Sequence, residues 1–331
     1  QRGAPDFFSV ASGIYLFPSE AVQGSEAANP RSEYSFEGSA LWIRQLQEVD
    51  ERLREIDDDK GDARELDRLN LRARKVSQLE KLGRFEDAFS LALSVYADSQ
   101  TLLGPEHPNT LASANNLAGL YESTGRYGEA EPLYRETLEA SRRVLGPEHP
   151  NTLASANNLA YLYERTGRHG EAEPLYRETL EARRRVLGPE HPNTLASANN
   201  LAGLYESTGR SEAEPLYRET LEASRRVLGP EHPDALLIAN NLAYLYRKTG
   251  RYAEAEPLFR ETLEARRRVL GPEHPDTLMS ANNLAYMYES TDRSLEAQAL
   301  LESLLPDVQR LPPGHEVRRA VESQLAVYKS K

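Results

Sequence analysis

Histidine is the residue type in this chain whose spacing most clearly suggests chemistry. Five of the seven histidines occupy the same Gly-Pro-Glu-His-Pro motif in successive parts of the chain: His107, His149, His191, His232 and His274. A metal ion needs ligands at about 2 Å, whereas packed helices lie about 8–10 Å apart. Histidines carried by separate helix pairs are therefore too distant to share an ion. We predict no metal site and expect these histidines to cap the turns in which they lie.

Other patterns typical of catalysis are absent from the sequence. The 331 residues include no cysteine, which excludes a thiol nucleophile and cysteine-ligated zinc or iron–sulfur sites. No glycine-rich phosphate loop, His-Glu-x-x-His motif or nucleophile elbow occurs. The repeated Glu-Ala-Glu and Arg-Glu-Thr segments are typical of a charged helix face supported by pairs at i and i+4. The sequence therefore predicts a protein that is not an enzyme, with no catalytic residues and no cofactor.

The charge balance argues against nucleic acid as a partner. The chain has 40 Lys and Arg against 52 Asp and Glu, a formal net charge of −12, which repels phosphate backbones and anionic lipid. The longest apolar stretch near the start, residues 7–17, is shorter than the roughly 20 residues of a membrane span. We expect a soluble, intracellular or organellar protein without a membrane span. The first residue, Gln1, fits a processed transit or signal peptide as well as a piece of a longer chain.

A repeated block of residues must position all of these side chains. The block restarts at Leu103, Leu145, Leu187, Leu228 and Leu270, in steps of 42, 42, 41 and 42 residues. Its first two copies differ only at four pairs of positions: Gly119/Tyr161, Ser123/Arg165, Tyr127/His169 and Ser141/Arg183. Such self-similarity at a fixed period is typical of stacked repeats. We expect the single short step, near residue 211, to shorten a turn and leave the helices intact.

Each repeat is predicted to form two helices. Apolar or small residues recur at helical spacing in both halves of the first copy: Leu111, Ala114, Leu117, Ala118 and Tyr121, then Ala130, Leu133, Tyr134, Thr137, Leu138 and Val144. Gly125 ends the first helix, and the Gly-Pro-Glu-His-Pro segment separates one repeat from the next. One pair cannot cover its own apolar faces, so successive pairs must stack. The predicted fold is an all-α solenoid.

The chain divides into four predicted parts. Residues 1–38 form an extended arm, and residues 39–62 an amphipathic helix and linker with Trp42, Leu46, Val49, Leu53 and Ile56 on one seam. That helix either packs on the first repeat as a cap or pairs with a helix of a partner. Residues 63–310 form the array, with a degenerate first repeat at 63–102 and clear repeats from 103, 145, 187, 228 and 270. Residues 311–331 form a C-terminal capping helix.

The repeat has a family resemblance. Its pattern, NNLAxLYxxTGRYxEAExLYRxTLExxxxVLGPxHP, resembles the 42-residue tetratricopeptide repeats of kinesin light chains and light-chain-like proteins. The resemblance implies a right-handed superhelix of helix–turn–helix pairs whose first helices line a concave groove. It also implies a protein partner, bound there as an extended or helical segment. The heptad coiled coil of kinesin light chain is missing from the N-terminus as given, so the motor function is not carried over.

The resemblance places one asparagine of every repeat in the groove: Asn115, Asn157, Asn199, Asn240 and Asn282. Side-chain amides donate and accept, so a ladder of them suits the backbone of an extended peptide. The adjoining asparagines, Asn116, Asn158, Asn200, Asn241 and Asn283, are expected to bond neighbouring helices. That both rows are structural remains an alternative.

Two further rows are candidates for recognition. The most variable position between copies carries Gly119, Tyr161, Gly203, Tyr244 and Tyr286, either for recognition or through neutral drift. Beyond it lie Glu122, Glu164, Glu206, Arg247 and Glu289, followed by Ser123, Arg165, Ser207, Lys248 and Ser290. We expect an exposed, mostly acidic rim that favours a polar or basic segment, although exposed charges are often merely solvated.

The sequence therefore predicts a non-enzymatic scaffold that binds protein segments in its groove. One alternative is a peripheral subunit or assembly factor of a larger complex, docked through Phe7, Phe8, Tyr15 and Trp42. Another is the sensor domain of a longer regulatory protein. The identity of the partner and the oligomeric state cannot be read from the sequence.

Overall fold

The computed structural model describes residues 38–57, 62–81, 84–311 and 316–329, and every regular element in these ranges is an α-helix. The helices are α1 (Gly38–Asp57), α2 (Asp62–Lys81), α3 (Phe85–Leu103), α4 (Pro108–Ser123), α5 (Tyr127–Val144), α6 (Pro150–Arg165), α7 (His169–Leu187), α8 (Pro192–Ser207), α9 (Ala213–Val227), α10 (Pro233–Lys248), α11 (Tyr252–Val269), α12 (Pro275–Glu289), α13 (Ser294–Val308) and α14 (Glu316–Lys329). The predicted all-α class is confirmed.

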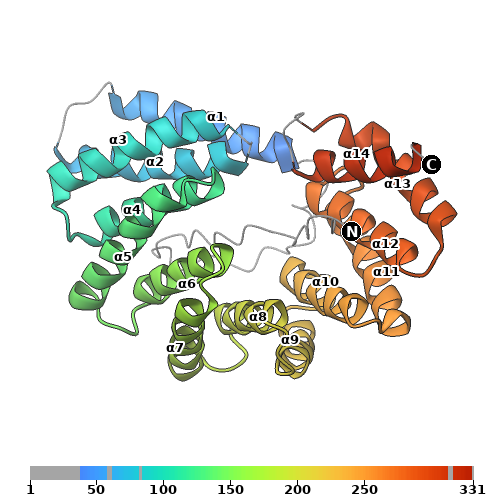
Figure 1. The fold of residues 1–331 in the computed structure, drawn as a ribbon. Helices are drawn as coiled ribbons and strands as arrows, with labels where there is room; N and C mark the ends of the chain where they lie inside the picture. Colours follow the sequence, from blue (N-terminus) through green and yellow to red (C-terminus); the bar gives the residue numbers. More distant parts are fainter. Residues whose placement is uncertain (1–37, 58–61, 82–83, 312–315, 330–331) are drawn as a thin grey trace. The chain divides into compact units, whose positions relative to one another are not determined.

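The chain forms two compact units. We call Ser39–Ser197 the N-terminal unit and Ala198–Lys331 the C-terminal unit. Within each unit the helices pack in consecutive pairs, such as α4 with α5 and α10 with α11, and each pair packs on the next (Figure 1). The predicted solenoid of helix–turn–helix pairs is therefore confirmed.

The predicted apolar stripes form the core. In the first copy Leu117 and Ala118 of α4 are buried, as are Tyr134 and Leu138 of α5. The prediction is wrong for Val144, whose side chain is 43% exposed because it lies at the last residue of α5, where the chain leaves the packed pair. The helical period thus identified the buried face but not the point at which burial ends.

The first helices of successive repeats lie on the inner side of each unit. Helix α4 contacts α6 in the N-terminal unit, and α12 contacts both α10 and α14 in the C-terminal unit. Among the described helices, no contact of comparable extent joins α5 with α7 or α11 with α13. Because backbones approach more closely on the first-helix side, each unit curves with its first helices inside.

Histidine caps the N-terminus of every first helix in the five clear repeats. Its Nδ1 accepts a hydrogen bond from the backbone N–H two residues later, at 3.1–3.2 Å, in His107, His149, His191, His232 and His274. The proline that follows each histidine begins the helix, where its missing N–H costs nothing. The predicted capping role is confirmed.

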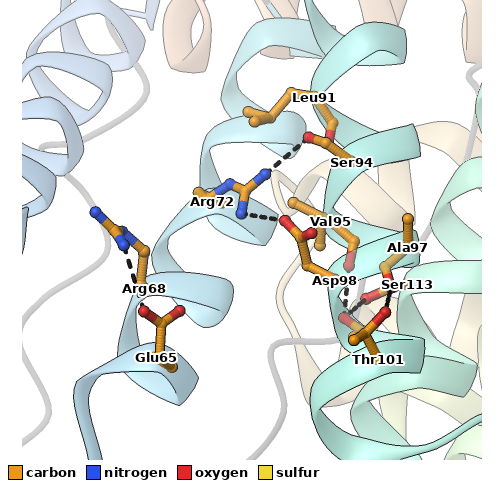
Figure 2. Close-up of polar contacts among 11 residues, drawn as sticks. Glu65, Arg68, Arg72, Leu91, Ser94, Val95, Ala97, Asp98, Thr101 and Ser113 are labelled. Atoms are coloured by element: carbon orange, nitrogen blue, oxygen red, sulfur yellow. Dashed lines mark hydrogen bonds and ion pairs between the residues drawn. The ribbon is translucent and has the colours of Figure 1, made fainter. Parts of the chain in front are cut away.

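Helix α1 covers the start of the array. Leu46 is buried in a cluster with Val76 and Leu79 of α2, and Lys75 Nζ donates to Asp50 Oδ1 at 2.5 Å. These contacts agree with the interpretation of this helix as a cap on the first repeat. Arg72 then joins α2 to α3, donating to Ser94 Oγ at 2.8 Å and to Asp98 Oδ2 at 2.6 Å (Figure 2).

Helix α14 closes the other end. Val317, Val321 and Leu325 are buried against α12 and α13, whereas Arg319 and Glu322 are exposed. An apolar inner face with a charged outer face is the arrangement predicted for a C-terminal cap.

The one-residue deletion in the third repeat changes a helix as well as a turn. Helix α9 has 15 residues, whereas its counterparts α5 and α11 each have 18. The expectation that the turn alone absorbs the deletion is therefore wrong. The shortened segment after Arg210 cannot reach the start of the second helix and also form its first turn, so α9 begins only at Ala213.

The turn after α12 contains a residue whose replacement should stabilise the fold. Asp292 has φ of 59°, where the equivalent turn positions have glycine, for example Gly250 with φ of 76°. Because this backbone conformation strains an L side chain, Asp292→Gly should raise the free energy of unfolding by about 0.5–1 kcal/mol, measured by urea denaturation. Gly250→Asp is the matched reverse change and should lower it. Equal stabilities in both comparisons would contradict this account.

The histidine cap of α12 should make the stability of the fold sensitive to acid. Burial and the charge of Arg266 lower the pKa of His274 below its ordinary 6.5, although Asp276 opposes them. The cap requires an unprotonated Nδ1, so its contribution is present above pH 6.5 and is lost as the pH falls through the lowered pKa. Asn is also a good cap but does not titrate. His274→Asn should therefore weaken the acid dependence of urea denaturation, whereas His274→Ala should cost about 1 kcal/mol at neutral pH.

Candidate functional site

The first helices expose a narrow face that is clearest in α6, whereas in α4 Asn115 and Tyr121 also reach solvent. In α6 the residues from Ala154 onward that reach solvent are Ala154, Asn158, Tyr161, Glu164 and Arg165, which recur at helical spacing. We call the positions of Ala154, Asn158, Tyr161 and Arg165 in all repeats the first-helix strip. Its other members are Ala112, Asn116, Gly119 and Ser123 on α4, Ala196, Asn200, Gly203 and Ser207 on α8, Leu237, Asn241, Tyr244 and Lys248 on α10, and Met279, Asn283, Tyr286 and Ser290 on α12. Gly119, Met279 and Asn283 are the members that are buried.

The second asparagine of each repeat, and not the first, belongs to this strip. The first-row side chains are largely enclosed: Asn157, Asn199, Asn240 and Asn282 are buried and Asn115 is half-buried. Asn116, Asn158, Asn200 and Asn241 are partly exposed. The expectation that the first row faces the groove is therefore wrong for its buried members. One residue along a helix is a rotation of about 100°, which turns the first amide into the helix interface.

The two asparagine rows also join successive repeats. Asn241 Nδ2 donates to Asn199 Oδ1 at 3.1 Å, and Asn283 Nδ2 donates to Asn240 Oδ1 at 3.1 Å. Each bond runs from the second asparagine of one repeat to the first asparagine of the repeat before it. In these two places, both in the C-terminal unit, the first-row asparagine is the acceptor for the second-row asparagine, which fixes the orientation of the Asn241 and Asn283 amides.

Two carboxylates of the expected acidic rim are buried, and the other two, Glu164 and Glu289, are half-buried. Glu122 is 7% exposed and Glu206 is 3% exposed, so the expectation of an exposed acidic rim is wrong for these two residues. The charge is accommodated because tyrosine hydroxyls of the second helices donate to the carboxylates. The pairs are Tyr134 to Glu122 at 3.1 Å, Tyr176 to Glu164 at 2.9 Å, and Tyr217 to Glu206 at 3.4 Å.

Burial also changes the acidity of these groups. It raises the pKa of Glu122 to about 7, and the hydrogen bond from Tyr134 and the charge of Arg165 offset only part of that shift. It likewise raises the pKa of Glu164 to about 7, against the hydrogen bond from Tyr176 and the same arginine. Both carboxyls therefore change charge close to neutral pH.

The carboxylate and the hydroxyl change together along the array. In the fourth repeat Arg247 replaces the glutamate and Phe259 replaces the tyrosine, so both partners are absent. In the fifth repeat Glu289 is retained, and Tyr328 and Gln324 of the capping helix donate to it instead. This linked substitution was a signal in the sequence that could have identified the pairs before the structure.

An arginine of the Thr-Gly-Arg turn forms a second recurring contact that the sequence did not predict. Arg168 lies over the ring of Tyr163 at 4.2 Å and donates to Glu171 Oε1 of its own repeat and Glu131 Oε2 of the repeat before, at 2.7 and 2.6 Å. Arg251 and Arg293 stack in the same way, over Tyr246 and Tyr288. These contacts hold repeats together on the side away from the strip.

The remaining predicted site residues are located as follows. Tyr161, Tyr244 and Tyr286 are half-buried on the strip, and Arg165 is exposed. Phe7, Phe8 and Tyr15 lie outside the described residues, and Trp42 lies in α1 but its side chain is not described. In the described ranges no three His, Asp or Glu side chains are grouped so as to hold a metal ion. None of the described helices has the length and apolar character needed to cross a bilayer.

Paired helices stacked with their first helices inside define the α-solenoid class of repeat proteins. A family model for the tetratricopeptide repeat matches residues 71–141, 111–185, 155–212, 211–264 and 234–307. These matches cover well over half of the chain. The chain therefore belongs to the tetratricopeptide repeat (TPR) family, as the repeat pattern predicted.

Solved structures include similar proteins of the kinesin light chain-like kind. One, from Podosopora anserina, has nearly identical TPR-like repeats and shares 30% identity over 61% of this chain and 96% of its own, with a TM-score of 0.51. BtubC (BKLC) from P. vanneervenii shares 23% identity over 70% of this chain and 95% of its own, with a TM-score of 0.56.

A third similar structure is that of NprR in complex with its cognate peptide NprX. It shares 14% identity over 88% of this chain and 83% of its own, with a TM-score of 0.61. The apo form, from B. thuringiensis, is described as a quorum sensor and has a TM-score of 0.57. Likeness at this level of identity concerns the fold alone. No match to this chain is found among curated proteins.

The buried carboxyls predict a stability that falls with rising pH. The folded-state pKa of Glu122, about 7, lies above the ordinary 4.5. The contribution of this group is therefore complete below about pH 4.5 and is lost as the pH rises through 7, at a cost on the order of 3 kcal/mol. Glu122→Gln should raise the urea midpoint at pH 8.5 and leave it nearly unchanged at pH 5. The exposed Glu139→Gln is the control, and equal effects of the two substitutions would contradict the assignment.

Proposed function

We propose that this protein is a non-enzymatic scaffold that binds a segment of a partner protein along the first-helix strip. The observation that carries the proposal is the row of partly exposed amides, exemplified by Asn158 and Asn241, on the solvent-facing strip of the first helices. An amide offers both a donor and an acceptor, which matches the backbone of an extended segment whatever its sequence.

The surroundings of the amides suit recognition. Tyr161 and Tyr244 stand one turn along the same face, and both are half-buried, so part of each side chain is available for contact with a partner, although the Tyr161 hydroxyl itself is buried. Adjacent first helices contact one another, so their strips are neighbours on the inner side of each unit. A single amide contact contributes only about 0.5–1.5 kcal/mol, so several repeats must act together. The peptide bound by NprR is consistent with this use of the fold.

A selection with a random-peptide display library on the immobilised chain tests the proposal. Selected peptides should lose about tenfold or more in affinity when Asn158→Ala and Tyr161→Ala are combined with Asn241→Ala and Tyr244→Ala, because two amide contacts and two rings are removed. Fluorescence anisotropy measures the affinity, and circular dichroism should show unchanged helicity. Arg135→Ala with Arg218→Ala, exposed on the second helices, is the control and should change nothing. Undiminished binding by the strip variant would eliminate the proposal.

A further inference from the structure

The array has a period of two repeats in addition to its period of one. Three positions alternate along the first four clear repeats. They read Gly119, Tyr161, Gly203, Tyr244 at the first position, Ser123, Arg165, Ser207, Lys248 at the second, and Ser141, Arg183, Ser224, Arg266 at the third. Two of the three lie on the first-helix strip. Small residues in the first and third repeats therefore alternate with a tyrosine and a cation in the second and fourth.

The alternation matches the division of the chain. The N-terminal unit contains Gly119 with Tyr161 and Arg165, and the C-terminal unit contains Gly203 with Tyr244 and Lys248. Each unit thus contains one set, by which we mean a repeat with glycine and serine followed by a repeat with a tyrosine and a cation at the same two strip positions. Packing does not require it, because Tyr286 directly follows Tyr244 in the next repeat of the same unit. The fifth repeat has Ser290 in place of a cation, so it does not complete a third set.

In the N-terminal unit the second repeat reaches back onto the first. Arg165 Nη2, on α6, donates to the hydroxyl of Tyr127, on α5, at 3.1 Å. The same guanidinium is close enough to Glu122 of α4 to stabilise its charge. Arg165 nevertheless remains exposed, and a guanidinium has five N–H donors, so it can bind a further acceptor.

The C-terminal unit has the corresponding arrangement. Lys248 Nζ, on α10, donates to the backbone oxygen of Glu206, on α8, at 3.4 Å and lies 3.7 Å from its Oε1. The lysine side chain is 41% exposed, while the glutamate side chain beneath it is 3% exposed. Arg247 lies over the ring of Tyr244 at 5.0 Å and adds a second positive charge.

The sign of the exposed charge identifies the ligand chemistry. In both sets the carboxylate next to the cation in the preceding repeat, Glu122 or Glu206, is buried and bonded to a hydroxyl of its own repeat. The cation faces solvent beside a tyrosine and an asparagine amide, and Glu164 of the first set is half-buried. A partner segment therefore meets a positive charge, although the chain as a whole has a net charge of −12. A carboxylate is the complement of such a site.

We propose that the first-helix strip contains two equivalent subsites, one in each unit, and that each binds a copy of the same short acidic segment. Tyr161 and Arg165 form the first subsite, and Tyr244 and Lys248 form the second. The segment lies extended along the asparagine amides, and its Asp or Glu side chain pairs with the cation. This inference rests on the function proposed above and adds to it the number of segments and their charge.

The substitutions for the test are taken from other repeats of the same chain. Tyr161→Gly with Arg165→Ser, and Tyr244→Gly with Lys248→Ser, introduce the residues that the first and third repeats already have at these positions. The probe is a single-copy acidic peptide from the display selection. Isothermal titration calorimetry should give two peptides per chain for the parent, one for each double variant, and none for the combined variant. Arg165→Gln and Lys248→Gln keep the tyrosines and should each weaken one of the two binding events about tenfold.

The outcomes separate this inference from the function on which it rests. The same peptide with Asn or Gln in place of Asp or Glu should bind the parent at least tenfold more weakly. The two subsites are overturned if the parent binds one peptide per chain, or if Arg165→Gln and Lys248→Gln leave the affinity unchanged. In either case the proposed function still holds if binding requires Asn158 and Asn241. A selection that enriches no peptide, or binding indifferent to the asparagines as well, contradicts both.

Discussion

Stacking of helix pairs is the constraint on which the rest of the structure depends. A first helix such as α6 buries Leu159 and Ala160 on one side and Leu162 and Tyr163 on others, so that only one narrow face is left for solvent. No isolated pair can bury so much apolar surface, and each repeat is therefore stable only against its neighbours. The same packing that makes the array stable also limits where a partner can be recognised.

The polar groups of the interior are arranged around this constraint. Glu122 and Glu206 would be costly to bury alone, and the hydroxyls of Tyr134 and Tyr217 satisfy them from the second helix of the same repeat. In the fourth repeat, arginine replaces the carboxylate at position 247 and phenylalanine replaces the tyrosine, with its hydroxyl, at position 259. A buried tyrosine hydroxyl without its acceptor would have the same desolvation cost, which explains why the two residues change together.

Connections between repeats are divided between two sides of each unit. On the first-helix side, asparagine pairs such as Asn241 with Asn199 join one repeat to the next. On the other side, arginines such as Arg168 stack on a tyrosine and pair with a glutamate of the preceding repeat. Because these stacked arginines lie away from the strip, their contacts are kept when strip residues vary, and only the bonds that the strip itself adds between repeats, such as that from Arg165 to Tyr127, are lost. This limited loss is consistent with the two-repeat alternation of Tyr161 and Arg165 with glycine and serine.

The sequence by itself determined the family, the paired helices, the capped turns and the positions of the buried stripes, because each of these depends on local spacing. The helical spacing of apolar residues predicted that Leu117 and Ala118 belong to the core, and the Gly-Pro-Glu-His-Pro motif predicted that His107 caps a turn. Only the tertiary structure decided which asparagine of each pair faces solvent, and that Glu122 is buried. Both depend on how a helix is rotated against its neighbours, and a difference of one residue, which a repeating pattern does not resolve, moves a side chain from interface to surface.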